Sequence, residues 1–120
     1  MLVAYWIVAA LTAVLFLAAG LMKLVRPKAA LPAMGMGWAD DYSTVSVKLI
    51  ALAEVVGALG LVLPAVTGIL PVLSPIAAVC LAVIMIGAVV VHVRRNEPPM
   101  AAALLVLSVA TAVLGFLALI

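Results

Sequence analysis

The chain has 120 residues, of which 71% are hydrophobic and 8% are charged, and its formal net charge is +2. A water-soluble domain is about half apolar and a quarter charged, and a chain of this length can bury only part of its surface, so a soluble globular fold is excluded. The few basic residues lie beside apolar segments, which gives no indication of nucleic-acid binding, and the single cysteine, Cys80, cannot form an intrachain disulfide.

Four apolar segments are long enough to cross a bilayer, which takes about 20 residues of helix. The predicted membrane-spanning helices cover residues 2–26, 45–63, 72–93 and 99–120. No basic residue precedes the first segment and its apolar core is long, which distinguishes it from a cleaved signal peptide. The sequence therefore predicts one all-α domain over residues 1–120, an integral membrane four-helix up-down bundle.

The first connection, residues 27–44, is much longer than the others and contains prolines and glycines that forbid one continuous helix. A connection of this length is usually functional. Trp38 and Tyr42 suit a segment at the headgroup level, so we predict an interface loop here. The second connection has no charged residue, and three prolines, Pro64, Pro71 and Pro75, are expected to break helices there together with Gly68.

Charge is sorted between the two ends of the predicted bundle. All charged residues except Glu54 belong to the first and third connections or their flanks: Lys23, Arg26, Lys28, Asp40, Asp41, Lys48, Arg94, Arg95 and Glu97. Both termini and the second connection lie at the opposite end. Because positive charge stays on the cytoplasmic side, we predict the long loop inside, both termini outside, and Tyr5 and Trp6 at the outer headgroups.

Glu54 places a carboxylic acid inside the second span, within "KLIALAEVVGALGLVLP". It follows Ser46 by eight residues, about 12 Å along a helix. A charge at such depth costs roughly 2.5–3.5 kcal/mol, so the side chain must face the bundle and not lipid. Lys23 and His92 lie at the same end of their own spans and are candidate partners, whereas Lys48 lies on another face of the second helix.

Two interpretations of this polar cluster stay open. A Glu–Lys pair with a histidine beside it can lock the register of the helices, and Lys23 and His92 can also extend to the interface. Alternatively, Glu54, Lys23 and His92 handle protons or orient a ligand, because acids inside membranes are by default a functional hypothesis. The sequence contains no flavin, haem or metal motif, so no metal ligand set is predicted.

Three stretches, in their order and spacing, resemble the DoxX-like family of small bacterial four-helix membrane proteins: "LAAGLMKLVRP", "KLIALAEVVGALGLVLP" and "TGILPVLSPIAAVCLAVIMIGAVVVHVRR". The resemblance covers nearly the whole chain. It implies a multi-pass protein of the bacterial inner, or cytoplasmic, membrane. Relatives often carry an arginine near the end of the last helix, whereas "VLGFLAL" has Phe116 and no arginine, so a role of that arginine is not carried over.

The resemblance implies function only loosely. Some relatives are subunits of quinone-linked thiosulfate oxidation and others belong to membrane oxidoreductase assemblies. The resemblance therefore favours an accessory subunit of a membrane redox system. A quinone would lie near Glu54, Lys23 and His92, and its electrons would come from a membrane or peripheral oxidoreductase partner. Whether the chain is itself an enzyme stays open.

Two alternatives stand beside the redox role. A non-enzymatic helper that binds another membrane protein is the first, because distant animal relatives resemble assembly helpers for receptors; a homo-oligomer is compatible with either role. A small proton-coupled transporter is the second. "LAEVVG" resembles the membrane glutamate of the small multidrug transporters, but that acid lies in their first helix and Glu54 lies in the second span.

Overall fold

The structure, a computed structural model, describes residues 1–34, 37–96 and 101–119. These residues form helices and no strand, which confirms the all-α prediction. The long helices are α1 (Leu2–Val25), α2 (Thr44–Thr67), α3 (Leu73–Arg94) and α4 (Ala101–Ala118), and three short 3-10 helices lie between α1 and α2, namely η1 (Lys28–Ala30), η2 (Pro32–Met34) and η3 (Gly37–Asp41). Each of the four long helices is long and apolar enough to cross a membrane.

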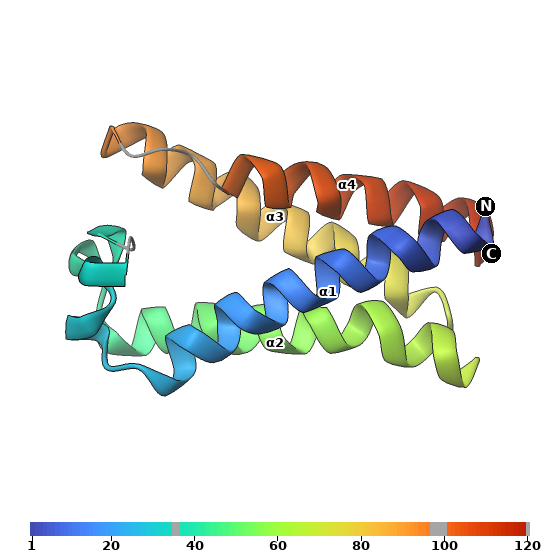
Figure 1. Cartoon of the computed structure of the whole chain (residues 1–120), viewed down its shortest axis with the longest axis horizontal. Coiled ribbons are helices and arrows are strands. Elements are labelled where there is room, and N and C mark those ends of the chain that lie inside the picture. Colours follow the sequence, from blue (N-terminus) through green and yellow to red (C-terminus); the bar gives the residue numbers. More distant parts are fainter. Residues whose placement is uncertain (35–36, 97–100, 120) are drawn as a thin grey trace.

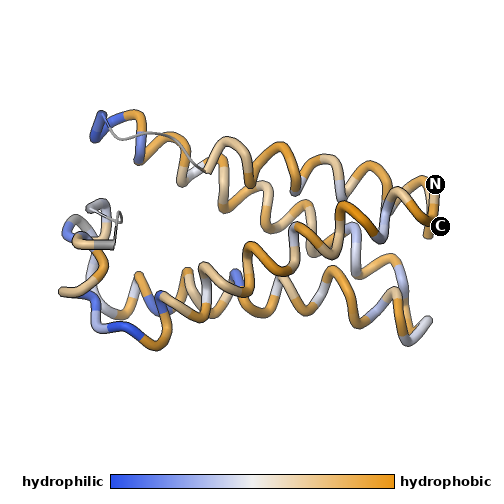
Figure 2. Tube along the Cα trace, in the orientation of Figure 1, coloured by the Kyte–Doolittle hydropathy of each residue, from blue (hydrophilic) through white to orange (hydrophobic). Residues whose placement is uncertain are grey.

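The long helices alternate in direction and form two pairs, α1 with α2 and α3 with α4 (Figure 1). Both termini lie at one end, and the 3-10 helices and the end of α3 lie at the other. Hydrophilic residues gather at the end that holds the 3-10 helices, whereas the helical shafts are mostly hydrophobic (Figure 2). Such shafts contact lipid, so the chain is a multi-pass membrane protein.

The helix ends follow local backbone chemistry. α1 ends at Val25, one residue before the predicted limit, because Arg26 is extended (φ −83°, ψ 143°) ahead of Pro27. α2 continues through Pro64, four residues beyond the predicted end at 63, and stops at Gly68 in the left-handed conformation (φ 72°). A proline so near the end removes only one intrahelical bond, and the Gly68 N–H donates to the Pro64 carbonyl at 3.0 Å.

The other two spans agree closely with the expected limits where they are described. α3 covers Leu73–Arg94 against the expected 72–93, with Pro75 in its first turn. α4 covers Ala101–Ala118, and the expected limits at 99 and 120 lie outside the described residues.

Close contacts through small residues hold neighbouring helices together. A Cβ atom added at Gly20 of α1 would lie 2.7 Å from the Val55 side chain and 2.9 Å from the Ala51 carbonyl oxygen of α2. One added at Gly57 would lie 2.6 Å from the Leu81 side chain of α3. In lipid, such close approach provides the packing energy that the hydrophobic effect provides in water.

Tyr5 differs from its expected place. It was expected among the outer headgroups, but its side chain is fully buried and its hydroxyl donates to the Leu61 carbonyl at 2.6 Å. Its ring contacts Trp6 edge to face, with centroids 5.4 Å apart. This difference has a physical cause. The Tyr5 phenol points into the bundle and finds a carbonyl acceptor there, so its hydroxyl does not need a water molecule as a partner. Tyr5 thereby ties α1 to α2.

Candidate functional site

Glu54 forms an ion pair in the interior of the bundle. Its side chain is 1% exposed, and its Oε1 accepts a hydrogen bond from Lys23 Nζ at 2.5 Å. α2 buries one face along Val47, Ala51, Glu54, Ala58 and Leu61, and this face turns the carboxylate inward. Lys23 reaches it from the last turn of α1. The two residues that the sequence placed at similar depth are therefore in direct contact.

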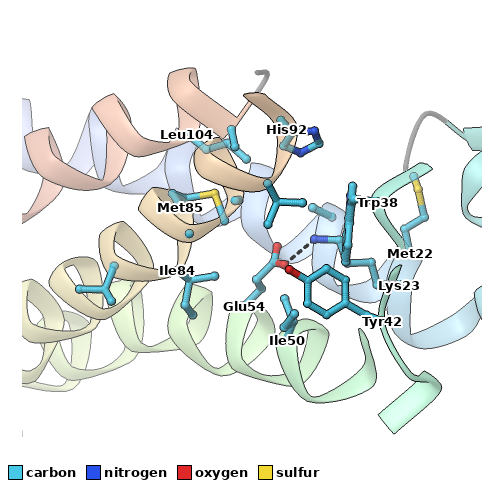
Figure 3. Close-up of a pocket in the computed structure, with 16 residues that line it drawn as sticks. Met22, Lys23, Trp38, Tyr42, Ile50, Glu54, Ile84, Met85, His92 and Leu104 are labelled. Carbon is cyan, nitrogen blue, oxygen red and sulfur yellow. Dashed lines mark hydrogen bonds and ion pairs between the residues drawn. The ribbon is translucent and has the colours of Figure 1, made fainter. Parts of the chain in front are cut away.

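The second carboxylate oxygen of Glu54 has no such partner among the described residues. Oε2 is buried and accepts no hydrogen bond from any described residue. Buried polar atoms in proteins almost always have a partner, and an ionised carboxylate has room for about four donors. The carboxylate lies at the wall of a cavity (Figure 3). Oε2 is thus a buried acceptor beside that cavity, without a hydrogen-bond donor among the described residues.

The long connection contributes two aromatic residues to the same place. The Trp38 ring centroid lies 5.4 Å from Lys23 Nζ, within the range of a cation–π contact. Tyr42 packs edge to face on Trp38, with centroids 5.9 Å apart, and its hydroxyl points toward the ion pair in Figure 3. Trp38 is only 9% exposed and shares a small core with Leu31, so the connection folds back onto the bundle.

Lys48 holds the end of α1 in place, a role that the sequence did not reveal. Its Nζ donates to the carbonyl oxygens of Lys23 at 2.5 Å, Leu24 at 3.1 Å and Arg26 at 2.6 Å. These carbonyls end a helix and have no intrahelical donors, and a cation there also opposes the negative end of the helix dipole. The sequence feature that could have indicated this role is the position of Lys48. It lies near the start of the second span, at the same end of the bundle as the end of the first span.

The cavity between the two helix pairs has a volume of about 610 Å³, which is within the usual range of small-molecule sites. All four long helices and the first connection contribute to its mostly apolar wall: Ala19, Met22, Lys23, Trp38, Tyr42, Ile50, Glu54, Val83, Ile84, Met85, Gly87, Ala88, Val91, His92, Ala101 and Leu104. His92 belongs to the α3 wall, across the cavity from the ion pair (Figure 3). The three predicted site residues therefore line one cavity, although only two of them form the ion pair.

This arrangement resembles a binding site for a molecule with an apolar body and a polar head. Apolar walls surround a few convergent polar groups, namely the Glu54 carboxylate, the Lys23 ammonium, the Tyr42 phenol and the His92 imidazole. Within the described part of the chain, no group of three or more His, Cys, Asp or Glu residues could hold a metal ion.

Comparison with known proteins identifies the family. No curated protein and no solved structure is significantly similar to the chain. The model of the DoxX-like family matches residues 7–115, a range that includes the site and most of every long helix. The chain therefore belongs to the DoxX-like family.

Proposed function

We propose that this protein binds a lipid-soluble molecule in the cavity between its helix pairs and serves as an accessory subunit of a membrane redox system, with a quinone or quinol as the bound molecule. The single observation that carries the proposal is that Glu54, which lines a largely apolar cavity of about 610 Å³, has a buried Oε2 that accepts no hydrogen bond from any described residue. A buried acceptor of this kind costs stability unless a donor satisfies it, and of the two forms only the quinol, through its hydroxyl, can donate to it.

The chemistry of the cavity suits a molecule of this class. Glu54 and Lys23 can accept and donate protons at one wall, and His92 lies at the other. Reduction of a quinone takes two electrons and two protons, and these side chains are of the types that transfer protons in enzymes. The electrons would come from an oxidoreductase partner, as the family resemblance implies.

Mass spectrometry of the intact complex, after gentle extraction from native membranes, tests this function. The wild-type protein should retain a lipid-soluble molecule that Glu54→Gln has lost. Thr12→Val is the matched control, because Thr12 is a buried polar residue of α1 that does not line the cavity. This variant should keep the molecule.

Folding must be separated from binding in this comparison. Glu54→Gln leaves Lys23 without its carboxylate, so a second variant, Glu54→Leu with Lys23→Met, removes both charges. It should fold as the wild type does and still lack the ligand. A wild-type complex that carries only a protein partner would contradict the ligand site and support the helper role.

A further inference from the structure

Three residues of the cavity wall are exposed on the outside of the bundle. They are Met22 of α1 and Val83 and Gly87 of α3. Val83 is 63% exposed, and it lies one helical turn from Gly87 on the same face of α3. A residue that lines a cavity and is also exposed marks a place where the cavity reaches the surface.

Gly87 differs from the glycines that pack helices together. A Cβ atom added at Gly87 would meet no described atom within 4 Å. By contrast, a Cβ atom added at Gly57 would lie 2.6 Å from the Leu81 side chain, and one added at Gly60 would lie 2.9 Å from the Ala77 side chain. Gly57 and Gly60 close the contact between α2 and α3 in the half of the bundle nearer the termini. The contact between α2 and α3 is therefore tight in that half, whereas a side chain at Gly87 would have open space at the edge of the cavity.

The opening at Gly87 lies at the depth of lipid. Gly87 precedes the end of α3 at Arg94 by seven residues, which is about 10 Å of helix. The opposite wall of the cavity at α2 is formed by Ile50 and Glu54. A molecule that passes Gly87 from the bilayer thus reaches the carboxylate without crossing the polar end of the bundle.

We propose that the gap between α2 and α3 at Gly87 is a lateral portal, through which the ligand enters from the bilayer and in which its hydrocarbon tail remains. The proposal rests on the ligand-binding function above and adds the route and the pose. The cavity holds the head beside Glu54 Oε2, and a long tail extends past Gly87 and Val83 into lipid. Gly87 then limits the cross-section of the tail.

The test uses the full chain in lipid nanodiscs with para-dodecylphenol as the probe, a neutral molecule with one hydroxyl donor and one linear tail. Binding is measured by titration and native mass spectrometry. Gly87→Leu should bind the probe about tenfold more weakly, because the leucine side chain must be displaced from the path of the tail. Gly87→Ala should bind as the wild type does, since its Cβ has open space.

Ile86→Phe provides the matched control, because Ile86 is an exposed residue of α3 next to Gly87 that does not line the cavity. It should leave binding unchanged. Thermal melting of each variant verifies that the bundle is folded, which the open space at Gly87 predicts for both substitutions there. The methyl ether of the probe, which has no hydroxyl donor, should bind poorly to every variant.

The possible outcomes separate the portal from the function. Wild-type affinity in folded Gly87→Leu would overturn the portal while leaving the binding site intact. Weaker binding in Met22→Phe, a variant at the exposed wall residue of α1, with no effect of Gly87→Leu would move the entrance to α1 and also overturn the portal. A wild-type chain that binds neither the phenol nor its ether would count against the ligand-binding function itself and, with it, the portal.

Discussion

At the scale of single residues, the Lys23–Glu54 pair carries both structure and chemistry. A buried ion pair recovers its desolvation cost only when its remaining hydrogen-bonding positions are satisfied. Lys23 has a carboxylate and an aromatic ring around its ammonium, whereas Glu54 Oε2 accepts no bond from a described residue. Among the described residues the pair is therefore incompletely satisfied at Oε2, which is unusual for a purely structural lock.

A double-mutant comparison distinguishes the two interpretations of this pair. Glu54→Leu should lower the free energy of unfolding by about 3–5 kcal/mol, because Lys23 is left buried without a counter-charge. Adding Lys23→Met should recover most of this loss. Equilibrium unfolding in mixed micelles, followed by circular dichroism, measures both values. A double variant as unstable as the single one would show that the ion pair itself holds the bundle together.

Tyr5 offers a second prediction at this scale. Tyr5→Phe removes the hydroxyl that donates to the Leu61 carbonyl at 2.6 Å, which should reduce the free energy of unfolding by roughly 0.5–1.5 kcal/mol. Probe binding should not change, since Tyr5 does not line the cavity. The same unfolding assay applies, with Trp6→Phe at the neighbouring, half-buried ring as the control. An equal loss in both variants would mean that aromatic packing matters here and the hydrogen bond does not.

At the scale of helices, Lys48 connects the start of α2 to the end of α1. Lys48→Met should leave three carbonyl groups of α1 without their donor and loosen its last turn. We expect amide hydrogen exchange at Lys23 and Leu24 to become about tenfold faster or more, equivalent to roughly 1–3 kcal/mol of local stability. Lys28→Met, in the same connection, is the control. Unchanged exchange in Lys48→Met would show that water or lipid headgroups replace the cap.

Alanine substitutions at two glycines, Gly20 and Gly87, should affect the stability of the bundle differently. Gly20→Ala should destabilise the bundle by about 1–3 kcal/mol, because its Cβ would meet the Ala51 carbonyl oxygen at 2.9 Å and backbone cannot move aside cheaply. Gly87→Ala should be neutral or slightly stabilising, since alanine is the better helix former and nothing described lies within 4 Å. Thermal melting in detergent compares them. Equal melting temperatures would contradict the close approach of α1 and α2.

The sequence predicted where the helices lie in the chain better than how each helix is rotated about its own axis. Hydropathy and length locate the spans, and helix-end positions place Lys23 and Glu54 at one depth. Almost every position in the shafts is apolar, however, so no polar face indicates which side of a helix turns inward. The inward Tyr5, the cap by Lys48 and the contact of Trp38 with Lys23 all depend on that rotation or on the path of the first connection.

At the scale of the whole molecule, the distribution of charge predicts the orientation in the membrane. The hydrophilic end in Figure 2 carries the 3-10 helices and the basic end of α3, and the termini lie at the other end. The basic residues near the helix ends there are Arg26, Lys28, Arg94 and Arg95. Because basic residues tend to stay on the cytoplasmic side, we predict that the cavity lies in the cytoplasmic half of the bilayer, where the proposed partner would meet the protein.

Cysteine labelling tests this orientation. In a Cys80→Ser background, Ile69→Cys places a thiol between α2 and α3 at a position that is 71% exposed, and Asp40→Cys places one on the exposed side of η3. A membrane-impermeant maleimide should label Ile69→Cys in spheroplasts and should label Asp40→Cys only after lysis, because the charge distribution puts the first connection inside. The Cys80→Ser protein alone should stay unlabelled. The reverse pattern would place the first connection and the open half of the cavity on the outer side of the membrane, out of reach of a cytoplasmic partner.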